Sequence, residues 1–240
     1  MSAPRRVALA TGAAALAHML PSVAVLGQWT PLRTTAGGGF VWRGTSQARI
    51  ALTFDDGPDP ANTPAVLDRL DALGVRATFF CLGERVAANP GLAGEMHARG
   101  HEIGTHGHRH HSHFRHTALW IADDLRRATD AMADAGLPVP QWFRPPFGHV
   151  SAGTVVCARS RRLPIVLWSA MGREWVEPTA AAVAARVRRS LSPGAVVLLH
   201  DAEINTGSSS RVVAALEPIT AAIAARGWDA VPLGELLSGR

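Results

Sequence analysis

From Arg49 onward, the sequence alternates short runs rich in β-branched and aromatic residues with longer runs of helical spacing. Residues typical of helix starts and ends separate the runs, such as Thr63-Pro64 and Thr117 at starts and Gly136 at an end. Strands that alternate with helices are typical of a parallel α/β sheet, either a closed or nearly closed barrel or an open sheet covered on both faces. We predict seven strands, at 49–54, 76–82, 101–105, 142–144, 164–168, 195–199 and 228–232.

Length and composition fit one large domain with a substantial core, since 47% of the 240 residues are hydrophobic. The formal charge of +5 comes from 24 Arg and no Lys, and these Arg residues are scattered along the chain. Short clusters such as 159–162 and 186–189 fall in or at the ends of predicted helices, where a solvated face explains them better than a nucleic-acid site. We therefore expect no nucleic-acid partner.

The N-terminal region has a composition of its own. Arg5-Arg6 precedes a short apolar stretch that ends in Ala15-Leu16-Ala17, which fits a secretory signal. A second apolar stretch up to Leu26 makes a membrane anchor the alternative, and an Ala-rich helix packed on the domain is a third interpretation. We expect an extracytoplasmic or membrane-associated protein, with a cytoplasmic one as the alternative. The predicted units are a signal-like or anchoring segment at 1–36, a linker at 37–48 that begins with Gly37 to Gly39, and a folded domain at 49–240.

Polar side chains of complementary kinds follow five of the predicted strands. In barrels of parallel strands, active sites gather at the C-terminal ends of the strands. The sequence therefore predicts an active site at this end of the sheet, although each residue alone also fits a structural role. The side chains are, in chain order, Asp55 with Asp56, His106, Arg144, Glu174 and His200.

Six of the eleven histidines lie within 106–116, a density that suggests metal binding. A His-rich surface loop is the alternative interpretation. With Asp56, two imidazoles would give the three protein ligands of a catalytic Zn²⁺ site and leave one position open. Spacing leaves the pair undecided: His106 and His110 are four residues apart, but His108 with His111 or His113 fits nearly as well.

Four segments of the chain resemble, in order and spacing, the first, second, third and fifth motifs of the NodB-type polysaccharide deacetylases, which are carbohydrate esterase family 4. The resemblance extends from about Ile50 to Leu237. It implies a distorted (β/α) barrel of about seven parallel strands, which agrees with the strand pattern. The four segments are Thr53-Phe-Asp-Asp-Gly-Pro58, His106-x-x-x-His110, Arg144-Pro-Pro-Phe-Gly148 and Leu198-Leu-His200.

The resemblance implies a role for each matching residue. Asp56, His106 and His110 are expected to hold a divalent metal, most simply Zn²⁺. Asp55 is expected to be the general base, oriented by Arg144, and His200 the general acid. The backbone N–H of Phe147 is expected to help stabilise the oxyanion. The substrate-binding residues are then Pro146, Phe147, Trp175 and Leu198.

The fourth motif departs from the family pattern. Met171 stands where the family has the Asp that supports the catalytic His, and Glu174 replaces a second Asp. The charge partner of His200 is therefore open, and we expect Glu174 to supply part of the missing charge and tune this acid. Asp201 and Glu203 are alternatives. His111 also stands where proline is common.

Together these features predict a metal-dependent hydrolase that removes N-acetyl groups from amino sugars of a polysaccharide, such as peptidoglycan or a chitin-like glycan. One alternative is an O-deacetylase on a similar polymer. Another is a catalytically impaired glycan-binding protein, because of Met171, and a third is metal storage by the His cluster. We expect a monomer whose partner is an acetylated glycan, with membrane association through the N-terminus.

Overall fold

The computed structural model describes residues 39–238. The predicted N-terminal segment at 1–36 and the first two residues of the predicted linker lie outside this range. Within it, every helix is too short or too polar to cross a lipid bilayer.

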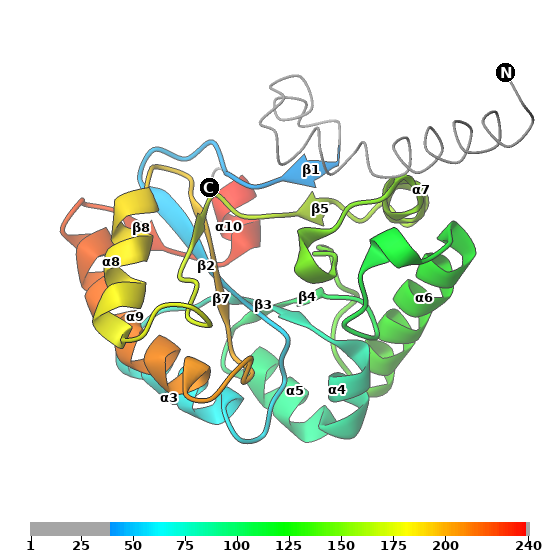
Figure 1. Ribbon diagram of the computed structural model, residues 1–240, viewed down its shortest axis with the longest axis horizontal. Coiled ribbons are helices and arrows are strands. Elements are labelled where there is room, and N and C mark those ends of the chain that lie inside the picture. The colour runs from blue at the N-terminus through cyan, green and yellow to red at the C-terminus, as the bar shows by residue number, and fades with distance from the viewer. Residues whose placement is uncertain (1–38, 239–240) are drawn as a thin grey trace, which may run out of the picture.

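The described chain alternates strands and helices, as predicted (Figure 1). Two short 3-10 turns, η1 at His113–Arg115 and η2 at Pro146–Gly148, interrupt the longer loops. The strands are β1 (Phe40–Val41), β2 (Arg49–Asp55), β3 (Thr78–Cys81), β4 (Glu102–Thr105), β5 (Ile165–Val166), β6 (Ala170–Met171), β7 (Val196–His200) and β8 (Asp229–Ala230). The helices are α3 (Thr63–Ala72), α4 (Gly83–Ala88), α5 (Pro90–Ala98), α6 (Ala118–Asp134), α7 (Ala152–Ser160), α8 (Ala180–Ser190), α9 (Ser208–Ala224) and α10 (Leu233–Ser238).

The strands pair in parallel in the order β4-β3-β2-β7-β6, and β8 pairs with the start of β2. Beyond β4, the sheet continues through Phe143, which forms one parallel bridge with Thr105 of β4 and another with Ile165 of β5. Strand β5 in turn pairs with β1. The chain then runs from β5 into β6, on the far side of β7. The result is a distorted parallel α/β barrel with most helices on its outside (Figure 1).

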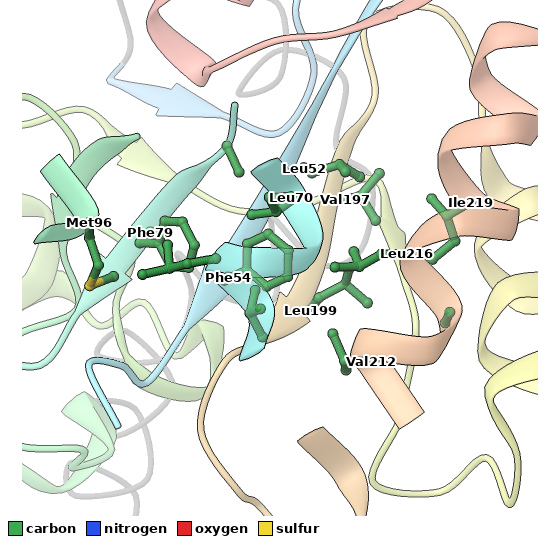
Figure 2. Close-up of a cluster of buried hydrophobic side chains, with 14 of the residues drawn as sticks. Leu52, Phe54, Leu70, Phe79, Met96, Val197, Leu199, Val212, Leu216 and Ile219 are labelled. Atoms are coloured by element: carbon green, nitrogen blue, oxygen red, sulfur yellow. The ribbon is translucent and has the colours of Figure 1, made fainter. Parts of the chain in front are cut away.

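Side chains of β2 alternate between the two faces of the sheet, as a strand dictates. Ile50, Leu52 and Phe54 point outward into the main core, where Figure 2 shows Leu52 and Phe54 among side chains of β3, β7, α3 and α9. Thr53 and Asp55 therefore face the inside of the barrel. The hydrophobic pattern of one strand thus determines that a carboxylate lies at the C-terminal end of the barrel interior.

Helix ends follow the predicted signals with one exception. The Thr117 hydroxyl accepts a hydrogen bond from Trp120 N at the start of α6, and Gly136, just beyond its end, has a φ of 72°. Thr63, expected as a cap, is instead the first residue of α3, and its hydroxyl donates a hydrogen bond to Asp201 at 2.5 Å.

Three of the predictions differ from the structure. The predicted strand at 142–144 is reduced to isolated bridges at Phe143, because Pro145 has no N–H for strand pairing and the 3-10 turn η2 begins at Pro146. The short strand β6 was missed. The segment predicted as a linker, 37–48, contains β1, and its Phe40 and Trp42 side chains are buried against Phe143 and Ile165. From Phe40 onward this segment is therefore part of the packed domain.

Candidate active site

Asp55 ends β2 as a buried carboxylate held by a buried arginine. Arg144 Nη1 donates to Asp55 Oδ1 at 2.6 Å and to Thr53 Oγ1 at 2.9 Å. Arg144 Nε donates to the carbonyl oxygen of Val166, and Nη2 donates to that of Leu167. The Arg144 guanidinium also lies 4.0 Å from the centre of the Phe80 ring. Both side chains are almost fully buried, so each charge depends on the other for stabilisation. Asp55 Oδ1 is therefore fixed, and Oδ2 faces His106 at 3.8 Å.

The next residue, Asp56, lies beside two imidazoles. Its φ of 77° is left-handed, a conformation that Asp tolerates better than most residues. Asp56 Oδ1 lies 3.4 Å from His106 Nε2 and 3.3 Å from His110 Nε2. Among the described residues, these three form the one group of His, Cys, Asp or Glu whose ligand atoms lie close enough to hold a metal.

The donor set fits a divalent metal in two further respects. His106 Nδ1 lies 2.7 Å from the carbonyl oxygen of Arg144, which only accepts, so Nδ1 donates this hydrogen bond and Nε2 is the nitrogen that faces Asp56. Asp56 Oδ1 is buried and has no hydrogen-bond partner within the part of the chain that the structure describes. Two ligands that bind Zn²⁺ at about 2.1 Å in tetrahedral geometry lie about 3.4 Å apart, which is close to the separations seen here.

The protonation states also suit metal binding. Burial lowers the pKa of His110 to about 4, against the attraction of Asp56, so its imidazole is neutral at neutral pH. Burial opposes the charge of Asp56, but His106, His200 and His110 together hold its pKa well below the usual range. A neutral imidazole and an ionised carboxylate are the forms that coordinate metal.

A residue that the sequence analysis missed holds the loop between the two histidines. Asp124, buried on α6, accepts hydrogen bonds from His108 N at 2.8 Å and Arg109 N at 3.2 Å. Gly107 has a φ of 85°, and a Cβ there would lie 2.7 Å from Asp124 Oδ2. Asp124 therefore fixes the loop that presents His106 and His110. Asp124 is one of two adjacent Asp residues on this helix, so nothing in the sequence distinguishes it from its neighbour Asp123.

The other histidines of the cluster lie elsewhere. His113 is fully buried, with Nδ1 3.0 Å from Thr154 Oγ1, and burial lowers its pKa to about 3. His111 and His116 stack with the Trp120 ring on α6. The structure thus brings together His106 and His110 and separates them from the alternatives His111 and His113.

His200 ends β7 beside the three candidate metal ligands, and Glu174 is the carboxylate partner of His200. Glu174 Oε1 lies 2.7 Å from His200 Nδ1, and the Glu174 side chain is fully buried. Burial opposes the charge of His200, but the hydrogen bond and charge of Glu174, with Asp55 and Asp56, raise its pKa to about 9. His200 is therefore protonated at neutral pH.

The two alternative carboxylates have other partners. Asp201 accepts from Gly57 N at 3.1 Å and from Thr63 Oγ1, and burial raises its pKa to about 7. Glu203 accepts from Ser209 N at 3.1 Å and from Gly207 N. Both stabilise loops at the end of the barrel.

The residues expected to bind substrate surround these groups. The Trp175 ring meets the His200 ring edge to face at 5.3 Å between centroids, and Leu198 is buried on β7 in register with Thr53. Pro146 is buried in η2, and the next residue, Phe147, is 55% exposed with a φ of 61°.

Comparisons with known proteins give a consistent result. A family model described as polysaccharide deacetylase matches residues 43–166. The peptidoglycan-N-acetylglucosamine deacetylase PgdA of Listeria monocytogenes is 34% identical over 188 residues, which are 78% of this chain but only 38% of that protein. A chitooligosaccharide deacetylase of a Bradyrhizobium species is 34% identical over 196 residues, covering 78% of this chain and 90% of that protein.

A solved structure is also similar. The peptidoglycan N-acetylglucosamine deacetylase Bc1960 superposes with a TM-score of 0.79 at 28% identity, and the match covers 83% of this chain and 93% of that one.

Proposed function

The chain belongs to the polysaccharide deacetylase family, and on this basis we propose that it is a metal-dependent hydrolase that removes N-acetyl groups from amino sugars of a glycan, either peptidoglycan or a chitin-like chain. The observation that carries the proposal is the grouping of a buried base, a metal-ligand set and a protonated imidazole at one end of the barrel. The names of the relatives support the acetylated amino sugar as substrate.

In this proposal, Asp56, His106 and His110 hold the metal, with Zn²⁺ the ion that suits two imidazoles and a carboxylate best. When bound, such an ion polarises the amide carbonyl and lowers the pKa of water. His106 donates through Nδ1 to the Arg144 carbonyl, which leaves Nε2 directed toward Asp56 Oδ1, and Asp56 is ionised.

Asp55 acts as the general base. The hydrogen bond from Arg144 fixes Oδ1 of Asp55 and leaves Oδ2 directed toward the candidate metal ligand His106. At this position Oδ2 can take a proton from water. His200 acts as the general acid, because its raised pKa keeps a proton available for the leaving amine. Pro146, Phe147, Trp175 and Leu198 bind the acetylated sugar, and the backbone N–H of Phe147 helps to stabilise the oxyanion.

The proposed substrate is found outside the cytoplasm, so an extracytoplasmic or membrane-associated location follows, with the N-terminal segment as its signal or anchor. The chain is proposed to act as a monomer. A cytoplasmic enzyme that acts on soluble oligosaccharides is the alternative.

The test is acetate release from a panel of N-acetylated peptidoglycan, chitooligosaccharides and O-acetylated xylan, with zinc, cobalt or chelator. We expect metal-dependent release that is matched by new free amine. Acetate without new amine would identify an O-deacetylase instead. Stoichiometric metal without acetate from any substrate would indicate a glycan-binding protein that has lost turnover, and several metals per chain would indicate metal storage.

A further inference from the structure

The end of α7 carries a cluster of arginines without acidic partners. The three residues of this arginine cluster, Arg159, Arg161 and Arg162, are all exposed. The sequence has no Asp or Glu between Asp134 and Glu174. Within the described chain, neither Arg159 nor Arg162 forms an ion pair. The cluster therefore presents uncompensated positive charge to anything that lies against this end of the helix.

One of these arginines stands where the backbone favours glycine. Arg162 has a φ of 55°, and its N–H donates to the carbonyl oxygen of Arg159 at 3.0 Å as the helix ends. Glycine adopts this left-handed conformation without the steric cost that a side chain incurs. An arginine is therefore a less stable choice than glycine at this position, which favours a role for its side chain at the surface.

Two exposed aliphatic side chains lie on α7 and its neighbour α6. Val156 on α7 is 62% exposed, and Leu119 on α6 is 85% exposed. The helices meet where Cys157 Sγ donates to the Ala118 carbonyl oxygen at 3.2 Å, and each aliphatic residue is next in sequence to one residue of this contact. Arg161 Nη2 donates to a backbone carbonyl oxygen of α6 at 2.8 Å, which ties the cluster to the same surface. The solvent face of the two helices thus combines aliphatic groups with positive charge.

Acidic groups on the solvent face of α6 are already paired. The carboxylate oxygens of Asp123, one turn after Leu119, lie 2.7 Å from Arg126 Nη2 and 2.9 Å from Arg127 Nε. Arg126 Nη1 also lies 2.6 Å from Asp130 Oδ2. These ion pairs balance one another, so they leave the positive charge of the arginine cluster in place.

The described chain enters the domain beside this cluster. The carbonyl oxygen of Gly39 accepts a hydrogen bond from Ile165 N at 2.6 Å, and Arg162 lies three residues before Ile165. Phe40, the first residue of β1, packs in the same apolar cluster as the last turn of α7 (Figure 1). The chain that precedes Gly39 therefore reaches the domain at this face, and the sequence predicts a signal or membrane anchor within it.

We propose that the solvent face of α6 and α7 docks on an anionic lipid bilayer, with the arginine cluster at the headgroups and Val156 and Leu119 against the acyl chains below them. Arginines near a negatively charged membrane gain electrostatic attraction, and adjacent aliphatic side chains add burial at the interface. A bilayer is favoured over a soluble polyanion, because a polyanion would leave the aliphatic groups in water and because the predicted anchor reaches the domain here. The docking face concerns where the protein is held and is independent of deacetylation.

The test is sedimentation of the full chain with vesicles of phosphatidylcholine, with and without phosphatidylglycerol. One arginine near an anionic surface contributes about fivefold to binding, so R159Q/R162Q should bind the anionic vesicles about 25-fold more weakly than the wild type. V156S should bind them about fivefold more weakly, because less apolar surface is buried. All variants share the N-terminal segment, so the differences between them report on the docking face.

The matched control is R188Q/R189Q. It removes two exposed arginines from the last turn of α8, the same kind of helix end, and Figure 1 shows α8 and α7 on opposite sides of the barrel. Charges so far from the bilayer are screened, so this control should bind within about twofold of the wild type. Thermal unfolding of each variant checks that the fold is kept, as expected for exposed residues without ion pairs.

Two results would overturn the proposal. One is R159Q/R162Q binding anionic vesicles as tightly as R188Q/R189Q does. The other is unchanged vesicle binding by V156S together with equally tight binding of the wild type to soluble polyphosphate, because the cluster would then be a site for polyanions. The vesicle assay needs neither metal nor acetylated substrate, so the docking face and the proposed deacetylase activity stand or fall separately.

Discussion

The pairing of Glu174 with His200 predicts how the activity depends on pH. Replacing Glu174 by Gln keeps the size of a fully buried side chain and removes its charge. The amide can still contact His200 Nδ1, so packing is preserved while the attraction for a proton is lost. The expected result is a lower pKa for His200 and an alkaline limb of the pH–rate profile that moves toward lower pH.

The magnitude follows from the pKa of His200, which is raised from its ordinary value of 6.5 to about 9. At about 1.4 kcal/mol per pKa unit, this difference of about 2.5 corresponds to about 3 kcal/mol in favour of the protonated form. A bound divalent cation would offset the charges of Asp55 and Asp56, which leaves Glu174 as the main negative group at His200. We therefore expect Glu174→Gln to move the alkaline limb by about one to two pH units.

The same change should alter stability in the metal-free chain. Folding raises the pKa of His200, so its protonation stabilises the folded state fully below pH 6.5, and this contribution is lost as the pH rises through about 9. Denaturant unfolding at several pH values should show this loss between about pH 6.5 and 9 in the wild type and a much smaller loss in Glu174→Gln.

The assay is acetate release from pH 6 to 10 with the metal content measured at each pH. Glu177→Gln is the matched control, because Glu177 pairs with Arg186 at 3.0 Å rather than with His200. An alkaline limb that stays in place in Glu174→Gln, with metal still bound, would show that Glu174 does not set the protonation of His200 or that His200 is not the acid.

Four further predictions concern the same site. Asp55→Asn should reduce turnover by at least about 100-fold while the chain keeps its metal, and loss of metal on dialysis would place Asp55 among the ligands. His110→Ala should abolish stoichiometric metal binding, whereas His113→Ala should retain it, as measured by metal analysis after gel filtration. Asp124→Asn should weaken metal affinity by about tenfold in a competition assay with a chelating dye, because one of the two backbone hydrogen bonds to the ligand loop is lost; unchanged affinity would make its role purely structural. Met171→Asp should move the alkaline limb of the pH–rate profile to higher pH, and a limb that moves the opposite way would refute the expected role of this position.

The barrel interior could be predicted from the sequence because one strand encodes it locally. Alternation along β2 places Leu52 and Phe54 in the core and Asp55 inside the barrel, and each step follows from the geometry of a strand. β1 could not be predicted in this way. Its partner β5 begins at Ile165, more than a hundred residues later, and the preceding Gly37 to Gly39 has the composition of a linker. Pairing between distant short strands leaves no periodic pattern within either one.

The metal ligands were ambiguous for a similar reason. Spacing within 106–116 fits several His pairs, and the choice among them depends on helices that follow later in the chain. Asp124 on α6 shapes the loop that carries His106 and His110, and Thr154 on α7 binds His113 in the interior. The motif resemblance selected the pair that lies beside Asp56, whereas the packing that separates the pairs appears only in three dimensions.

The fourth motif shows how a substitution can be compensated by chain geometry. Glu174 lies three residues after Met171, and Arg173 between them has a φ of 53°, which turns the chain. Arg211 on α9 donates to the Glu174 carbonyl through Nη2 at 2.8 Å and through Nε at 3.1 Å, which fixes this turn. Because the backbone is held in this way, the Glu174 carboxylate meets His200 without a rearrangement of the loop. Met171 therefore does not leave His200 without a carboxylate, and the reason is an anchor 37 residues away that the motif itself does not contain.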